Sequence, residues 1–165
     1  MKTLYEVCTP RADVLQGAIR ESDFAADLAQ VLRQDADTPD EYKEAGAFFA
    51  NTYPTEGLKA VLSNVGKRLR GAGGAASSIF RLDTQYGGGK THGLIALTHL
   101  AQGMPGVTNI DEFIDPSLVP RGDVRVAAFD GENAEPISGR KFPDGVTAFT
   151  PWGEIAHGLG GVAGY

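Results

Sequence analysis

The sequence has little of what marks secreted and membrane proteins. Its single cysteine, Cys8, cannot form an internal disulfide, which fits a reducing compartment. No run of about 18 apolar residues occurs, so no transmembrane helix is expected. The N-terminus has no apolar core followed by a small-residue cleavage site, so it does not read as a secretory signal. These absences favour a cytoplasmic protein without membrane contact.

Basic charge is also scarce. The chain has 15 Lys and Arg against 21 Asp and Glu, a net charge of −6, and its pI is near 5.0. Nucleic-acid-binding modules usually carry a basic domain or stripe, so we expect only weak or indirect contact with nucleic acid. The local basic stretch of Lys59, Lys67, Arg68 and Arg70 is better explained as the solvated face of a helix.

Glycine, in contrast, is abundant, at 22 of 165 residues. The glycines follow no collagen-like period and cluster near residues 71–74, 87–89 and 158–164. A hydrophobic content of 42% is ordinary for a globular protein. The length corresponds to roughly one domain.

Residues 1–72 are predicted to form an N-terminal helical section. A first helix is expected after Ser22, with a helical apolar stripe that includes Leu28. Thr38 and Pro39 are predicted to cap and begin a second helix, in which Glu41 completes a capping box. A third helix is expected after Thr55, and its apolar stripe comprises Leu58, Val61, Leu62, Val65 and Leu69.

Residues 77–165 differ from residues 1–72 in their predicted secondary structure, because strands are expected as well as helices. Residues 77–83 and 123–130 are rich in β-forming residues and are predicted to be strands, and a helix is expected over 90–102. Residues 131–150 are expected to be loop, followed by a short helix near 152–159. Strand, helix and strand in this order predict a βαβ unit with a parallel sheet. Because two strands do not complete such a sheet, we expect the chain to be the N-terminal piece of a longer protein.

The segment DTQYGGGKTH, residues 83–92, carries the clearest functional motif. The phosphate-binding P-loop, or Walker A motif, has the pattern G-x-x-x-x-G-K-[ST]. Aligned on Lys90, the segment supplies the last glycine, the lysine and the hydroxyl residue, while Thr84 stands at the first glycine position. With a strand before and a helix after, the motif predicts an α/β fold of the P-loop NTPase class.

The three glycines of this loop, Gly87, Gly88 and Gly89, would let backbone N–H groups approach a triphosphate closely. The N-terminus of the following helix would attract the same anion. The alternative is a flexible glycine loop in which Thr91 only caps the helix.

The next three residues would supply the chemistry on ATP and Mg²⁺. Lys90 is the expected catalytic residue, placing a full positive charge on the outer phosphates. Thr91 is expected to bind Mg²⁺ through its hydroxyl. His92, in the first turn of the helix, would lie close to the phosphates.

Other candidate groups are weaker. Asp130 and Glu132 end the second predicted strand as a Walker B motif would, but the alternative is a turn, with the true motif beyond residue 165. No pair among His92, His99 and His157 has metal-ligand spacing, so structural roles are favoured for the histidines.

Four strings carry a family resemblance: YGGGKTHGLIAL, FFANTYPTEGL before it, PWGEIAHGLGG after it, and TPRADVLQGAIRESDFAADLAQV near the N-terminus. Together they resemble a family of large bacterial AAA+ ATPases of uncharacterised function. Members are commonly encoded beside DNA methyltransferases or helicases in anti-phage and restriction-like loci. The resemblance implies an AAA+-like sheet over 77–165, truncated here, with sensor residues further along the chain. It also implies a homo-oligomeric full-length protein, and it places the segment of Pro10, Arg11, Val14 and Gly17 near the adenine.

The sequence and the resemblance together predict an ATP-binding protein. In full length it would be an ATPase that couples hydrolysis to remodelling in a phage-defence or DNA-modification system, with a methyltransferase or helicase as partner. The first alternative is a nucleotide-gated binding module without useful hydrolysis. A P-loop phosphotransferase and a purely structural interaction protein are further alternatives.

Overall fold

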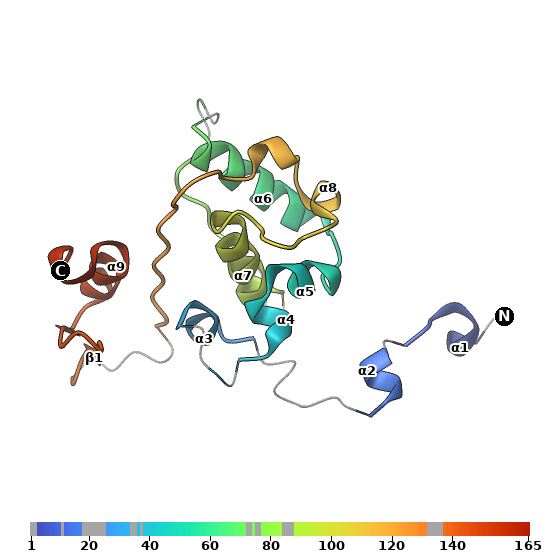
Figure 1. The fold of residues 1–165 in the computed structure, drawn as a ribbon, viewed down its shortest axis with the longest axis horizontal. Helices are drawn as coiled ribbons and strands as arrows, with labels where there is room; N and C mark the ends of the chain where they lie inside the picture. The colour runs from blue at the N-terminus through green and yellow to red at the C-terminus, as the bar shows by residue number, and fades with distance from the viewer. Residues whose placement is uncertain are drawn as a thin grey trace.

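A computed structural model describes residues 3–10, 12–17, 26–33, 36, 38–71, 74, 77–83, 88–131 and 137–165. Helices make up most of its regular structure (Figure 1). The helices before the glycine-rich loop are α1 (Leu4–Val7), α2 (Ala12–Leu15), α3 (Leu28–Arg33), α4 (Asp40–Lys43), α5 (Ala45–Ala50) and α6 (Glu56–Leu69). Those after it are α7 (Lys90–Ala101), α8 (Ile110–Phe113), the short 3₁₀ helix η2 (Pro116–Leu118), α9 (Pro151–Gly160) and the 3₁₀ helix η3 (Gly161–Ala163).

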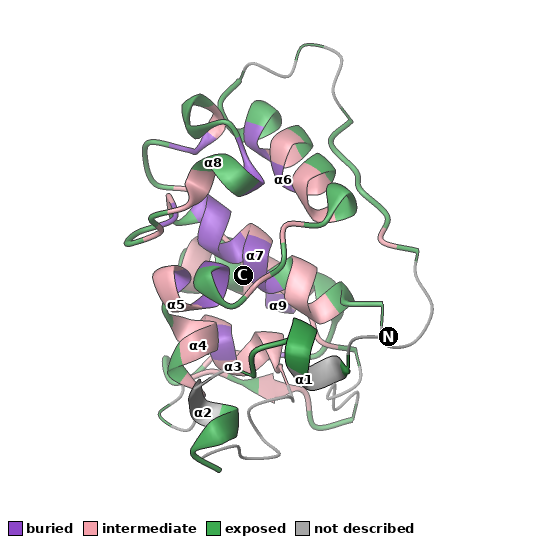
Figure 2. Cartoon of the chain, turned by 90° about the vertical axis from the view of Figure 1, so that its right-hand side faces the viewer, coloured by how far each residue is buried: buried purple, intermediate pink, exposed green. Residues whose placement is uncertain are grey.

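Helix α7 lies at the centre of the fold and packs against α3, α5 and α6. Its second half is enclosed, and Figure 2 shows the buried residues concentrated along it. Burial of apolar side chains is the main stabilising term here. The core cluster contains residues that precede the glycine-rich loop in the sequence and residues that follow it. Its members are Val31, Phe48, Phe49, Leu62, Ile95, Ala96, Leu100, Met104, Phe113, Ile114 and Val119.

Helix α6 confirms the third predicted helix. The Oγ1 atom of Thr55 accepts a hydrogen bond from the backbone N–H of Leu58 at 3.3 Å, which caps the helix start. Gly71, just past the end, has a φ of 69°, a conformation that glycine adopts without strain. The helix predicted over 90–102 is confirmed as α7, and the one near 152–159 as α9.

The predicted cap at Thr38 is wrong. The N-cap residue of α4 is Pro39, with no side-chain cap bond, and the side chain of Thr38 is buried instead. Glu44 then takes an extended backbone, with φ −94° and ψ 114°, so the expected single helix is divided into α4 and α5.

The predicted α/β fold with a P-loop NTPase parallel sheet is wrong for the described residues. Neither 77–83 nor 123–130 forms a strand, and the described sheet is a two-stranded antiparallel pair. Its strands, β1 (Arg140–Lys141) and β2 (Thr147–Ala148), lie in the segment expected to be loop. The apolar side chains of 77–83 are not buried: Ile79 is 81% exposed, so packing does not hold this segment in a sheet.

The C-terminal part is built around α9. Thr150 caps this helix by accepting a bond from the N–H of Gly153 at 3.1 Å, and Pro151 is its first residue. Segment 123–130 runs beside it, and Arg125 Nη1 donates to the carbonyl oxygen of Leu159 at 2.8 Å. In Figure 1 this part lies at one end of the molecule and α1 at the other.

No helix in the described part of the chain is long and apolar enough to cross a membrane.

Candidate functional site

The glycine-rich loop opens onto a cavity of about 430 Å³, here called the glycine-loop pocket. Three segments line it: the entry into α6 with its first turns, the end of 77–83, and the start of α7. The lining residues are Thr52, Tyr53, Thr55, Gly57, Leu58, Val61, Leu82, Gly88, Gly89, Lys90, His92 and Gly93.

The start of α7 gives this pocket a polar end. Gly89 is the N-cap, with φ 72° and ψ 22°, a left-handed conformation that explains why glycine stands before Lys90. The N–H of Gly93 donates to the carbonyl oxygen of Gly89 at 2.8 Å. The first-turn N–H groups of a helix have no acceptor within the helix, so this end can receive an anion.

His92 ties the start of α7 to the helical core. Its Nε2 atom lies 2.9 Å from Thr52 Oγ1, and its ring stacks on Phe48 with the ring centres 4.4 Å apart. The hydroxyl of Thr52 donates its hydrogen to the carbonyl oxygen of Phe48 at 2.7 Å. It must therefore accept from His92, which makes Nε2–H the donor. Burial lowers the pKa of His92, which favours this neutral form.

Tyr53 contributes an aromatic side chain to the same pocket. The residue is 81% exposed although its neighbours in the chain pack against α7. An exposed aromatic ring at the edge of a cavity is available to a ligand rather than to the core.

The structure brings together most of the residues predicted for the phosphate site. Gly88, Gly89, Lys90 and His92 line one pocket, and Thr91 lies beside them in the first turn of α7. Gly87 and Thr84 fall outside the described residues.

Sequence reasoning did not assign roles to Thr52 and Tyr53. They belong to the string FFANTYPTEGL, which was informative only through the family resemblance. Their position beside α7 comes from tertiary packing.

The remaining candidates lie elsewhere. Asp130 lines a different cavity, and Glu132 falls outside the described residues. Val14 and Gly17 are exposed and do not line the glycine-loop pocket. No group of three His, Cys, Asp or Glu side chains in the described residues could hold a metal ion.

His99 and His157 contact other protein groups outside the glycine-loop pocket. His99 is buried in the core, where Nε2 donates to the carbonyl oxygen of Tyr42 at 2.9 Å and burial lowers its pKa. His157 lies 2.6 Å from Asp144 and stacks on Phe142. The hydrogen bond from His157 holds the pKa of the Asp144 carboxyl below its ordinary value.

Comparison with known families gives a match over nearly the whole chain. Residues 4–161 match the family described as the DUF499 N-terminal domain. The chain belongs to the DUF499 family. That description names no activity, substrate or partner. Neither the curated proteins nor the solved structures gave a match.

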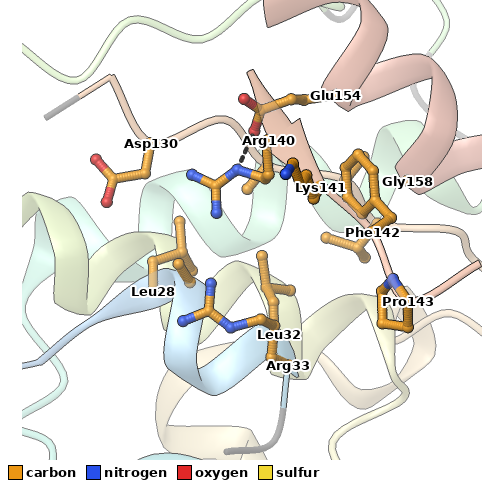
Figure 3. A pocket seen from close by; sticks show the side chains of 14 residues that line it. Leu28, Leu32, Arg33, Asp130, Arg140, Lys141, Phe142, Pro143, Glu154 and Gly158 are labelled. Atoms are coloured by element: carbon orange, nitrogen blue, oxygen red, sulfur yellow. Dashed lines mark ion pairs between the residues drawn. The ribbon is translucent and has the colours of Figure 1, made fainter. Parts of the chain in front are cut away.

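The DUF499 domain has a second and larger cavity, of about 630 Å³. It lies between α3, residues 126–130, the β1–β2 hairpin and α9, and it shares no lining residue with the glycine-loop pocket. The side chains around it include both charges and apolar groups (Figure 3). We call it the arginine cavity, after Arg33 and Arg140 in its walls.

Proposed function

We propose that this DUF499 domain binds ATP with Mg²⁺ in the glycine-loop pocket. One observation carries the proposal: a single cavity joins the glycine N-cap and lysine of α7 to an exposed aromatic ring. Polar groups at a helix N-terminus and an aromatic ring in one cavity match the two chemically different halves of a nucleotide. The parallel sheet predicted from the sequence is not part of this proposal.

The phosphate half would lie at the start of α7. Gly88 and Gly89 let the backbone approach phosphate oxygens closely, and the helix N-terminus adds its positive dipole end. Lys90 would place its charge on the outer phosphates, and Thr91 would supply a hydroxyl to Mg²⁺.

The base half would lie between Tyr53 and the apolar side chains of Leu58 and Val61, which line the same cavity. Stacking on an aromatic ring holds a base through its face and tolerates different bases. A volume of about 430 Å³ lies within the usual range of about 300–1,000 Å³ for ligand pockets.

The family resemblance extends the proposal to the whole protein. Lys90 would then be a catalytic residue of an AAA+-type ATPase whose hydrolysis drives remodelling in a phage-defence or DNA-modification system. This wider proposal includes a cytoplasmic, homo-oligomeric protein and a methyltransferase or helicase partner.

A nucleotide-gated binding module is the second candidate, and one contact favours it. Thr52 lies in the pocket wall, bonds to His92 at the start of α7 and donates to Phe48 in the core. A nucleotide that displaces this contact would change how α5 packs on α7, without any need for hydrolysis.

Calorimetric titration with Mg-ATP tests the proposal. We expect micromolar binding to the wild-type chain and at least tenfold weaker binding to Lys90→Ala, because one charge-assisted contact is worth about 1.5–3 kcal/mol. Lys67→Ala, which removes an exposed lysine from α6, is the matched control and should leave binding unchanged. Tyr53→Ala should weaken ATP and GTP binding to a similar degree.

The proposal is wrong if the folded chain does not bind Mg-ATP, or binds it equally well after Lys90→Ala. Phosphate release by the wild-type chain would favour the ATPase. Binding without phosphate release, together with a change in the His92 resonances, would favour the gated module.

A further inference from the structure

The arginine cavity is walled by α3 and by segments of the C-terminal part of the chain, the nearest of which begins 93 residues after Arg33, at Val126. Leu28, Ala29, Leu32 and Arg33 of α3 form one wall, and Val126, Ala127, Ala128 and Asp130 line a second. Hairpin and α9 residues complete it: Arg140, Lys141, Phe142, Pro143, Glu154 and Gly158. The cavity exists because the C-terminal part lies against α3.

Basic groups from two walls meet in this cavity. In Figure 3 the guanidinium groups of Arg33 and Arg140 point toward the same space from opposite sides. Arg140 is held by its Nε atom, which lies 2.7 Å from Oε2 of the nearly buried Glu154. This ion pair orients the guanidinium so that its other two nitrogens face the cavity.

The charges in the lining are unbalanced. Arg33, Arg140 and Lys141 are basic, whereas Asp130 and Glu154 are acidic. The charges of Arg140 and Glu154 offset each other in their ion pair, which leaves Arg33 and Lys141 against Asp130. The lining thus carries one net positive charge. A guanidinium fork matches the geometry of carboxylate and phosphate oxygens, which makes an oxyanion the complementary ligand group.

The remaining lining of the arginine cavity is largely apolar, and one of its aromatic rings packs on a neighbouring side chain. Leu28, Leu32, Ala127 and Phe142 offer hydrocarbon surface, and Figure 3 shows Phe142 across the cavity from Leu28 and Leu32. The ring of Phe142 stacks on His157 with centroids 3.8 Å apart, so this wall is fixed in orientation. An apolar wall beside a positive one fits a ligand with both characters.

We propose that the arginine cavity binds a small molecule that carries a phosphate or carboxylate group on an apolar body. Arg33 and Arg140 hold the anionic group, and the leucines and Phe142 enclose the body. This site is separate from the ATP pocket and goes beyond the function proposed above. Its volume of about 630 Å³ accommodates a molecule of drug or metabolite size.

Titration of the isotope-labelled chain with phenyl phosphate, followed by NMR, tests the proposal. Backbone amide shifts should change in Leu28–Arg33, Val126–Asp130 and Arg140–Phe142. Inorganic phosphate and benzyl alcohol each carry half of the ligand chemistry and should bind at least tenfold more weakly. Benzoate and phenyl phosphate, compared directly, show which anionic group the site prefers.

Three variants locate the site. Arg33→Gln, at an exposed position, should weaken phenyl phosphate binding at least tenfold. Arg68→Gln makes the same charge change on the exposed end of α6 and should have no effect. Lys90→Ala should also have no effect, which separates this site from the glycine-loop pocket.

Arg140→Gln alone leaves Glu154 without its ion-pair partner and can unfold the hairpin. The contribution of Arg140 to binding is therefore tested with the double variant Arg140→Gln and Glu154→Gln. It should bind phenyl phosphate as weakly as Arg33→Gln. Equal binding by wild type and both arginine variants, or shift changes confined to the start of α7, would overturn the proposal.

Discussion

The imidazole of His99 lies inside the helical core, and its burial makes the stability of this core sensitive to acid. Desolvation lowers the pKa of His99 below that of an exposed histidine, against smaller opposing effects from the Tyr42 carbonyl, Gln102 and Glu44. Below about pH 6.5 the imidazole of His99 is protonated in the unfolded chain but stays neutral in the folded chain. Falling pH therefore favours unfolding. The contribution of neutral His99 to the free energy of unfolding is complete above about pH 6.5 and is lost as the pH falls toward the pKa of His99 in the folded chain.

We therefore expect the free energy of unfolding to fall between pH 7 and pH 5.5, by at most about 1.4 kcal/mol from His99. Urea unfolding at the two pH values measures this change. The variant His99→Gln should show a smaller difference between pH 7 and pH 5.5, whatever its absolute stability. An unchanged pH dependence in that variant would show that His99 is not responsible. His92, whose pKa burial also lowers, contributes in the same direction and explains any remaining loss.

The positions of candidate site residues could be predicted where one short segment contains the whole motif. Lys90, Thr91 and His92 stand in one string, and the structure places all three in the first turn of α7. Tyr53 could not be assigned a role from the sequence because it reaches the pocket only through the packing of α6 on α7. For the same reason Arg33 and Arg140, 107 positions apart in the sequence, gave no sign that they line one cavity.

Helix α6 contains two glycines with opposite roles. A Cβ atom on Gly66 would lie 2.9 Å from both the carbonyl oxygen of Leu118 and the side chain of Ile114, whereas Gly57 has open space around it. Alanine is favoured over glycine inside a helix by up to about 1 kcal/mol. At Gly66 the steric clash with η2 outweighs the gain in helix propensity. The carbonyl oxygen of Leu118 belongs to the backbone, so it can move away only if η2 itself shifts.

Gly66→Ala should accordingly destabilise the protein by about 1–3 kcal/mol, a typical cost of overpacking. Gly57→Ala, the matched change in the same helix, should be neutral or stabilise by a few tenths of a kcal/mol. Thermal unfolding of both variants measures the contrast. Equal shifts in Tm would mean that α6 and η2 do not pack as closely as described.

Elements could be predicted when their signal was local. The apolar stripe of α6 predicts its position, and the ranges expected for α7 and α9 agree with the structure within a few residues. The strands at 77–83 and 123–130 were wrong because β-forming residues need partner strands and a buried face, which a local pattern cannot supply. The β1–β2 hairpin was missed because each strand has two residues, too few to show an alternating pattern.

At the scale of the molecule, the buried side chains are unevenly distributed. The apolar core cluster runs from Val31 to Val119 and draws on α3 and on the helices from α5 to α8. After Pro120 in the sequence, the described buried residues are Ala148 and Glu154. The C-terminal part therefore depends on polar contacts, chiefly the Arg140–Glu154 ion pair and the bond from Arg125 to Leu159. Regions with few buried apolar contacts open locally at lower free energy than the core.

Hydrogen exchange should show this hierarchy directly. We expect the buried amides of Ile95 and Leu100 in α7 to exchange at least about a hundredfold more slowly than the amides of α9, because α7 opens only with the core. Glu154→Gln removes one charge of the ion pair with Arg140 and should speed exchange in α9 and the hairpin at least about fivefold, leaving α7 unchanged. Glu112→Gln, at an exposed position on α8, serves as the control and should leave α9 unaffected. If Glu154→Gln accelerated exchange equally in α7 and α9, the two parts would open together, and the ion pair would stabilise the whole molecule rather than its C-terminal part alone.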